Sequence, residues 1–345
     1  MQPIHTFRQP GEIQPLADQA QNDSPARRAG RGGFTLTELL VVISIIAVLA
    51  ALGTVGVLRA LDTAKQTRIK TELDSLDLAL RAYKEKYGSY PPCDLTNSGP
   101  ASALRQHVAR AFPRYNIANL AGDLALAVDT TVFRPDQALV FWLQGFNPDP
   151  ANPFVTPAPN NYAITGGSAG SVTIKLAPLF DFDKSRLFVV PTSPAPTASV
   201  ASYFPAGVKA DATGAPYLYW EAGSSVINPA STTTSSYGKI VTPTPTVTPN
   251  TFNSAGTLFT NAGTAMPYWA DTINAGVVSP NENWVNIDSF QLIASGMDGK
   301  YGVAGATTTT RLYPTGAGYD TSTALADDDN VTNFCAKARL GDAKP

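Results

Sequence analysis

Residues 33–58 read GFTLTELLVVISIIAVLAALGTVGVL, an apolar run that contains one charged side chain, Glu38. No proline interrupts the run, and most of its residues are Leu, Val, Ile or Ala. An α-helix rises about 1.5 Å per residue, so the part from Phe34 to Leu58 can cross the roughly 30 Å of hydrocarbon in a bilayer. The run therefore predicts a membrane-spanning helix near the N-terminus.

The segment before this helix, residues 1–33, is polar and ends with ARRAGRGG at positions 26–33. Arginines beside a spanning helix favour the cytoplasmic side of the membrane for that end. A secretory signal peptide has its small-residue cleavage site after a shorter apolar core, whereas here the glycine pair comes before the core. We therefore expect a cytoplasmic leader over residues 1–33 and an apolar helix that stays with the mature chain.

Glu38 calls for a functional explanation, because a carboxylate in a lipid-embedded helix costs several kcal/mol unless it has a partner. Residues 33–38, GFTLTE, followed by LLVV, closely resemble the prepilin signature of type IV pilins and type II secretion pseudopilins. This resemblance implies that prepilin peptidase cleaves between Gly33 and Phe34 and that the new amine of Phe34 is methylated. It also implies that Glu38 neutralises the N-terminus of a neighbouring subunit during assembly. The alternative is an ordinary single-pass anchor with a coincidental glutamate.

An amphipathic pattern continues from the apolar run without a helix breaker. Apolar residues recur at alternating spacings of four and three, with charged residues on the other faces, as in a helix with one buried side. The stripe consists of Ile69, Leu73, Leu76, Leu80, Tyr83 and Tyr87. Gly88 and a Pro-Pro pair end the pattern. The sequence predicts one helix from about Phe34 to Tyr87, with a membrane-spanning half at 34–58. The amphipathic half, assigned to 59–90, is expected to pack on a sheet, with a coiled coil as the alternative.

The remainder, residues 91–345, has the composition of a strand-rich extracytoplasmic head. Only 15% of the chain is charged, whereas Pro (28 residues) and Gly (27 residues) are plentiful, which favours short strands and loops. The patterns predict strands at Val172–Leu176, Leu187–Val190 and Tyr217–Trp220, and a short helix at Gln137–Leu143. The Ser/Thr/Pro-rich stretch at about 222–270 is expected to be a solvated insertion, with a glycosylated or partner-binding loop as the alternative.

The fold class follows from these elements and from the resemblance. Residues 86–92, KYGSYPP, also look like the helix end of the major pseudopilin of type II secretion. The expected class is α+β with a pilin-like fold. In that fold a long N-terminal helix packs on a small antiparallel β-sheet, here with large loop insertions.

A second resemblance lies near the C-terminus. Residues 290–302, FQLIASGMDGKYG, predict a strand that enters an Asp-Gly turn, and they resemble the calcium-loop region of major pseudopilins. That resemblance implies a bound calcium ion held by backbone carbonyls near the turn and by downstream acidic side chains. Asp327, Asp328 and Asp329 are the candidates for the downstream part, and the expected acidic ligands are Asp298, Asp327 and Asp328. The alternatives are a simple turn role for Asp298 and a solvated acidic run at 327–329.

The remaining chemically reactive residues are few. Cys93 and Cys335 could form one long-range disulfide in an oxidising compartment. The mature chain keeps one histidine, His107, which is expected on a helix surface, and a Cys93–His107 catalytic pair lacks a recognisable nucleophile setting. We therefore expect that the protein is not an enzyme. The formal net charge of −2 gives no basis for nucleic-acid binding.

Together these features predict a structural subunit of a type II secretion pseudopilus or a type IV pilus-like filament. The implied partners are copies of the chain, other pilin-like subunits, prepilin peptidase and an inner-membrane assembly platform, and the implied cofactor is calcium. The expected location is the bacterial inner membrane as a single-pass protein, with the head in the periplasm, or at the cell exterior after assembly. The alternative is a membrane-tethered extracytoplasmic binding module that does not polymerise.

Overall fold

The computed structural model describes residues 33–93, 103–120, 135–147, 149–154, 178–189, 201–221, 252–253, 259, 262–270, 284–302, 311–316, 318–319 and 327–345. The chain divides into two compact units, Met1–Val55 and Gly56–Pro345. In the first unit the structure describes the beginning of helix α1, Leu36–Tyr87. The second unit holds the rest of α1 and every strand that the structure describes.

Helix α1 confirms the prediction of a single long N-terminal helix, with 52 residues from Leu36 to Tyr87. It ends where Gly88 adopts a φ of +86° and donates its N–H to the carbonyl of Lys84 at 2.7 Å. Glycine is favoured in this left-handed conformation because it has no Cβ to clash with the backbone. The predicted stripe is buried: Ile69, Leu73, Leu76, Leu80 and Tyr83 are at most 2% exposed.

Within the described residues, the strands form four small sheets. The three-stranded sheet has the order β3-β7-β9, with β3 at Leu218–Glu221, β7 at Phe290–Ala294 and β9 at Val331–Thr332. The two-stranded sheets pair β1 (Leu187–Val189) with β2 (Ala201–Tyr203), β4 (Phe252–Asn253) with β5 (Thr264–Ala265), and β6 (Trp269–Ala270) with β8 (Leu312–Tyr313). All strand pairs are antiparallel except β6–β8, which is parallel.

The elements predicted from sequence are confirmed where the structure describes them. Strands β1 and β3 lie within one residue of the predicted ranges 187–190 and 217–220, and β7 begins at the predicted Phe290. The predicted helix at 137–143 is α4, Ala138–Leu143. The predicted strand at Val172–Leu176 lies outside the described residues. The α+β class, with a long N-terminal helix and small antiparallel sheets, is therefore confirmed.

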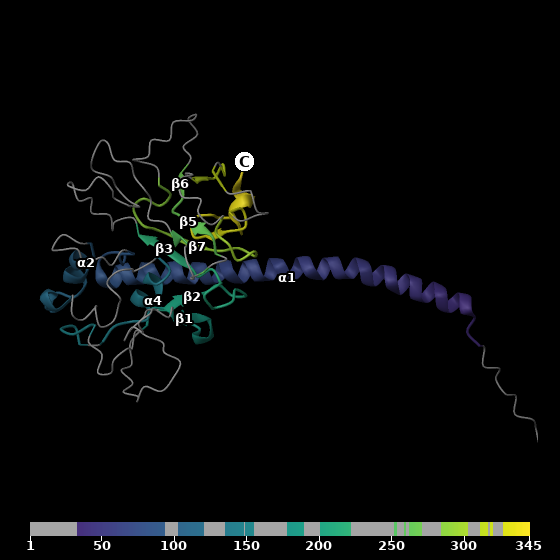
Figure 1. Cartoon of the computed structure of the whole chain (residues 1–345), viewed down its shortest axis with the longest axis horizontal. Helices are drawn as coiled ribbons and strands as arrows, with labels where there is room; N and C mark the ends of the chain where they lie inside the picture. The colour runs from purple at the N-terminus through teal and green to yellow at the C-terminus, as the bar shows by residue number, and fades with distance from the viewer. Residues whose placement is uncertain are drawn as a thin grey trace, which may run out of the picture. The chain divides into compact units, whose positions relative to one another are not determined.

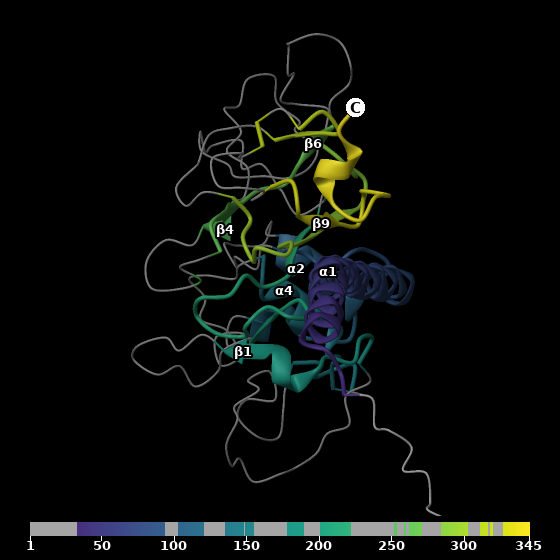
Figure 2. The same cartoon turned by 90° about the vertical axis from the view of Figure 1, so that its right-hand side faces the viewer.

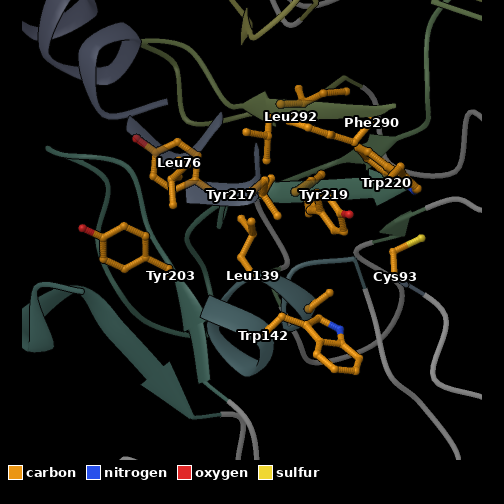
Figure 3. Packing of buried hydrophobic residues seen from close by; sticks show 14 of the residues in the cluster. Leu76, Cys93, Leu139, Trp142, Tyr203, Tyr217, Tyr219, Trp220, Phe290 and Leu292 are labelled. Carbon is orange, nitrogen blue, oxygen red and sulfur yellow. The ribbon is translucent and has the colours of Figure 1, made fainter. Parts of the chain in front are cut away.

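The core joins α1, α4 and the three-stranded sheet. All six residues of α4, ALVFWL, are buried, as expected for a helix that is apolar on every side. Figure 3 shows Leu139 and Trp142 of α4 gathered with Leu76 of α1 and with Tyr217. Trp142 also donates its indole N–H to the carbonyl of Pro92 at 2.9 Å, which fixes the chain just after α1 to this core.

The strands lie on two sides of α1 within the second unit. Figures 1 and 2 show β1 and β2 on one side, and β6 with the C-terminal segment on the other. The 3₁₀ helix η2, Lys184–Arg186, precedes β1, and η3, Leu340–Ala343, lies near the end of the chain. Further helices are α2, Ala103–Ala111, and the 3₁₀ helix η1, Ile117–Asn119.

The prediction of a solvated insertion at about 222–270 is wrong for the part that the structure describes. This part contributes β4, β5 and β6, and its aromatic residues Phe252, Phe259 and Tyr268 are at most 2% exposed. The ring of Phe259 lies 5.8 Å from that of Phe252 and 6.0 Å from that of Phe204. In the described residues of this stretch, the absence of charge therefore reflects burial in the core, which composition alone does not distinguish from a polar loop.

Candidate functional site

The first residues of α1 form a capped helix start. Thr35 donates its backbone N–H and its hydroxyl to Oε2 of Glu38, each at 2.8 Å. In return, Oγ1 of Thr35 accepts the backbone N–H of Glu38 at 3.2 Å. This reciprocal arrangement is a capping box, which supplies hydrogen-bond partners at the start of a helix. The carboxylate of Glu38, the residue singled out by the sequence, is thus hydrogen-bonded to Thr35 of its own chain.

The apolar side chains that follow are exposed. From Leu36 to Leu52 the large apolar side chains are 46–79% exposed, and Phe34 is 81% exposed. Mean hydropathy reaches 2.7 in this part of α1, and one helix among the described residues is long and apolar enough to cross a membrane. An exposed apolar surface of this size is typical of contact with lipid or with a partner protein.

The motif comparison covers this helix start. Residues 28–54 match the family model described as the prokaryotic N-terminal methylation motif. The matched range includes the predicted cleavage position between Gly33 and Phe34 and also includes Glu38. Comparisons with curated proteins and with solved structures give no significant match.

The motif and the α+β layout with its long N-terminal helix together support a type IV pilin-like protein that is processed as a prepilin. This motif implies processing by prepilin peptidase and assembly with pilin-like subunits. The apolar helix that follows it fits a protein anchored in a membrane by a single span.

The structure does not bring together the three predicted acidic ligands near the C-terminus. Asp327 is buried and forms an ion pair with Arg311, with 3.1 Å between Oδ1 and Nη1. Asp328 forms an ion pair with Lys344. Among the described residues, no three His, Cys, Asp or Glu side chains form a group that could hold a metal ion. The alternative of a solvated acidic run is also wrong, because Asp327 and Asp329 are buried, at 0% and 1% exposed.

Asp298 instead lies beside Asp329, the third aspartate of the downstream acidic run. Oδ2 of Asp329 accepts the backbone N–H of Asp298 at 3.0 Å. A Cβ atom at Gly296 would overlap the Asp329 side chain, so the glycine permits this close approach. The Ser-Gly-x-Asp-Gly pattern at 295–299 was therefore the sequence signal for a carboxylate packed against the turn, although it did not identify which carboxylate.

Asp329 has unusual electrostatic surroundings. Its side chain is 1% exposed, and Oδ1 has no hydrogen-bond partner among the described residues. Burial raises the pKa of Asp329 to about 6. The N–H of Asp298 lowers this pKa, whereas the negative charge of Asp298 raises it further. Burial also raises the pKa of Asp298. Oδ1 of the neighbouring Asn330 is likewise buried without a hydrogen-bond partner among these residues.

The two cysteines are not joined in a disulfide. The sulfur of Cys93 accepts the N–H of Glu221 in β3 at 3.5 Å, whereas Cys335 follows β9 and donates its thiol to the carbonyl of Arg339 at 3.6 Å. Strand β7 lies between β3 and β9. The expected long-range bridge is therefore absent from this structure.

His107 is buried, so its predicted place on a helix surface is wrong. Its ring nitrogens lie 2.9 Å from the hydroxyl of Tyr83 and 3.0 Å from that of Ser89, and its ring lies edge-on to Trp142. Burial lowers the pKa of His107 to about 4, with a smaller contribution from Arg110. The histidine is therefore neutral near pH 7 and connects α2 to the end of α1.

A second polar cluster that the sequence analysis missed is centred on Glu72 of α1. Arg186 donates to both oxygens of Glu72, with Nη1 2.8 Å from Oε2. The hydroxyls of Tyr203 and Tyr217 donate to Glu72 at 2.6 and 2.7 Å. Burial alone would raise the pKa of Glu72, but these hydrogen bonds and the Arg186 charge lower it. The cluster therefore ties α1 to η2, to β2 and to the residue before β3.

Proposed function

We propose that this protein is a structural subunit of a pilus-like filament, cleaved between Gly33 and Phe34 and assembled through α1. The N-terminal methylation motif carries the proposal, since the matched residues 28–54 include Gly33, Phe34 and Glu38. Within this class, the resemblances at 86–92 and 290–302 favour a major pseudopilin of a type II secretion system over a type IV pilus subunit. The proposed function is assembly and includes no catalytic step.

The geometry at the helix start supports a specific role for cleavage. Before cleavage, the nitrogen of Phe34 belongs to a neutral peptide bond, and after cleavage it is a cationic amine. Both hydrogen bonds that the Glu38 carboxylate accepts in the cap go to Oε2, so Oε1 can accept from the amine of a neighbouring chain. Opposite charges attract far more strongly in a low-dielectric helix bundle than in water. Pairing between chains thus requires the new amine and sets their axial register.

The proposed arrangement assigns the two parts of the chain to different surroundings. The exposed residues from Leu36 to Leu52 lie in the inner membrane before assembly and among the helices of other subunits afterwards. The head, which contains the described strands, lies in the periplasm and forms the outer surface of the filament. An inner-membrane assembly platform moves the subunit between these two states.

The direct test of this function is to fractionate cells that contain prepilin peptidase and an assembly platform. The mature chain is expected in the fibre fraction that shearing releases, and it should remain in the membrane fraction when the platform is deleted. A chain that stays in the membrane in both strains, with residues 1–33 attached, would favour the tethered binding module.

We further propose that calcium binds between Asp298 and Asp329. Calcium takes six to eight oxygen ligands at 2.3–2.6 Å, and carboxylates and amide carbonyls are among its usual ligands. Asp329 and Asn330 each have a buried side-chain oxygen without a hydrogen-bond partner among the described residues. Two neighbouring carboxylates with raised pKa values gain stability when a cation lies between them. This ligand set replaces Asp327 and Asp328, whose charges are paired with Arg311 and Lys344.

The free energy of unfolding should depend on pH and on calcium through the charge of Asp329. The folded-state pKa of Asp329, about 6, exceeds the ordinary value of 3.8. The contribution of its protonated carboxyl to the free energy of unfolding is therefore complete below pH 3.8 and is lost as the pH rises through 6. Without calcium, the loss amounts to about 3 kcal/mol in the free energy of unfolding by pH 7. Calcium should restore this stability at pH 7 and have little effect near pH 4, where the carboxyl is protonated.

The matched variant is Asp329→Asn, which retains an oxygen that can accept the N–H of Asp298. In the absence of calcium, the variant should be more stable than the wild type at pH 7 and equally stable near pH 4. Thermal unfolding with calcium and with a chelator measures both effects. An Asp329→Asn protein that gains as much stability from calcium as the wild type would contradict this site.

A further inference from the structure

His107 lies in the core where α2 meets the end of α1 and α4. Its side chain is 5% exposed, and its ring stacks on that of Tyr83 from α1, with 5.7 Å between the ring centroids and 17° between the planes. The ring of Trp142 from α4 lies edge-on at 5.0 Å. On the same face of α2, Leu104 and Val108 are fully buried. The histidine thus lies within the apolar contact that holds α2 against the rest of the core.

Two hydroxyl groups bind the ring nitrogens of His107, and their burial indicates where the proton of the neutral ring lies. Nε2 is 2.9 Å from the hydroxyl of Tyr83, and Nδ1 is 3.0 Å from that of Ser89. A neutral imidazole has one N–H donor and one acceptor nitrogen. Tyr83 is fully buried, and its hydroxyl has no other partner among the described residues, whereas Ser89 is only half-buried. The hydroxyl of Tyr83 therefore donates to Nε2, and Nδ1 donates to Ser89.

A second proton on the ring would go to Nε2, the nitrogen that already accepts from Tyr83. A protonated imidazole donates at both nitrogens, so two hydrogens would then lie between Nε2 and the oxygen of Tyr83 unless the hydroxyl turns away. Burial raises the pKa of Tyr83 well above its usual value, so the hydroxyl keeps its proton. A buried donor that loses its acceptor is destabilising. The hydrogen bond between α1 and α2 therefore exists in its present form only with a neutral histidine.

The groups that face the ring from the described part of the chain provide no counter-charge for a protonated histidine. The two hydroxyls and the indole are neutral, and the cation of Arg110, three residues after His107 on α2, repels a second positive charge. The charged residues in the last turn of α1, Lys84, Glu85 and Lys86, are exposed. Burial, with a smaller contribution from Arg110, lowers the pKa of His107 to about 4. The closed contact thus favours the neutral ring.

We propose that His107 is an acid-sensitive latch, whose protonation at Nε2 releases α2 from the end of α1 and exposes the apolar face of α2. The inference concerns the fold of the head and does not depend on filament assembly. Helix α2 has nine residues, which is too short for a stable isolated helix in water, so its contact with the core holds it in place. After release, the side chains of Leu104, Val108 and Phe112, which are buried in the closed state, face water.

The direction of the pH dependence follows from the lowered pKa of His107. In the released state the imidazole has its ordinary pKa of 6.5, so that state binds a proton more readily than the closed state does. The closed state is therefore favoured most above pH 6.5, and its advantage is lost as the pH falls towards 4. From pH 7 to pH 4 the equilibrium constant for release should rise about 100-fold. Asp329 acts in the opposite direction on global unfolding, so a local measurement on α2 is required.

Amide hydrogen exchange of the full chain in detergent, corrected for the intrinsic exchange rate at each pH, measures this local release. Protection of the amides at 104–112 should fall about 100-fold from pH 7 to pH 4, whereas protection of β1 and β2 should change less than about three-fold. The matched variant is His107→Gln, whose amide can accept from Tyr83 but cannot be protonated in this pH range. In this variant the protection of α2 should change less than about three-fold. A 100-fold fall that persists in His107→Gln would overturn the latch.

A nitrogen-15 NMR titration of selectively labelled histidine measures the protonation of His107 directly. The full chain contains two histidines, His5 and His107, and the signal that is absent from His107→Gln belongs to His107 even if that variant folds poorly. We expect a neutral ring with its hydrogen on Nδ1 at pH 7, a midpoint far below 6.5, and loss of α2 protection over the same pH range. A midpoint near 6.5, or protonation of His107 without loss of α2 protection, would contradict the inference.

Discussion

Glu38→Ala is expected to eliminate incorporation into filaments while leaving membrane insertion and cleavage between Gly33 and Phe34 intact. The apolar run keeps its length, and the residues on both sides of the cleaved bond are unchanged. The neighbouring amine, however, would enter a helix bundle without a counter-charge, and an unpaired buried charge is strongly destabilising. The amount in the sheared fibre fraction, relative to the mature chain in membranes, should fall at least ten-fold.

Glu38→Gln separates the charge from the helix cap. Glutamine at this position of a capping box can still accept the N–H and hydroxyl of Thr35, so the helix start is retained. If the charge pair sets the register, Glu38→Gln should fail to assemble as completely as Glu38→Ala. Glu85→Ala, which removes an exposed carboxylate near the other end of α1, is the control and should assemble normally. Normal fibres from Glu38→Gln would reject the charge-pair mechanism.

Arg186→Met is expected to lower the free energy of unfolding by about 3 kcal/mol, because it leaves Glu72 as an unpaired and largely buried charge. The side chains of Arg186 and Glu72 are only 15% and 14% exposed. Arg186 also donates to the carbonyl of Phe204 at 3.1 Å, so the variant loosens the contact between α1 and the β1–β2 pair. Chemical denaturation of the full chain in detergent, followed by tryptophan fluorescence, measures the loss.

The double variant Glu72→Gln/Arg186→Met tests the cause. It removes both charges but keeps an acceptor for the hydroxyls of Tyr203 and Tyr217, so it should recover at least half of the lost stability. Lys209→Ala removes a cation that is 81% exposed and paired with Asp211, and should change stability by less than about 1 kcal/mol. A double variant as unstable as Arg186→Met would show that packing, and not the unpaired charge, dominates.

The long helix could be predicted because its signals are local. A continuous apolar run, a stripe at spacings of three and four, and a glycine at the end each act within a few residues, and together they define α1 within two residues. The same holds for α4 and β7, whose apolar segments are bounded by turn residues. At the helix start, the residues that matter are adjacent in sequence, so GFTLTE alone was sufficient to select Glu38.

The rest of the site depends on contacts between residues far apart in the sequence. Glu72 belongs to the charged side of an amphipathic pattern, and nothing local indicates that Arg186, 114 positions later, makes it a buried ion pair. Similarly, composition cannot distinguish three consecutive aspartates. In the structure, Asp327 forms an ion pair with Arg311 and Asp328 forms one with Lys344. Asp329 packs against the turn at Gly296. His107 turns inward for the same reason, because Tyr83 and Ser89 supply partners from another helix and loop.

The most direct test of the central claim is the N-terminal residue and intact mass of the protein isolated from membranes of cells with and without prepilin peptidase. With the peptidase, we expect a chain that begins at methylated Phe34; without it, we expect the full chain with residues 1–33. An N-terminus at Met1 in both strains would contradict processing as a prepilin and would favour a tethered binding module that does not polymerise.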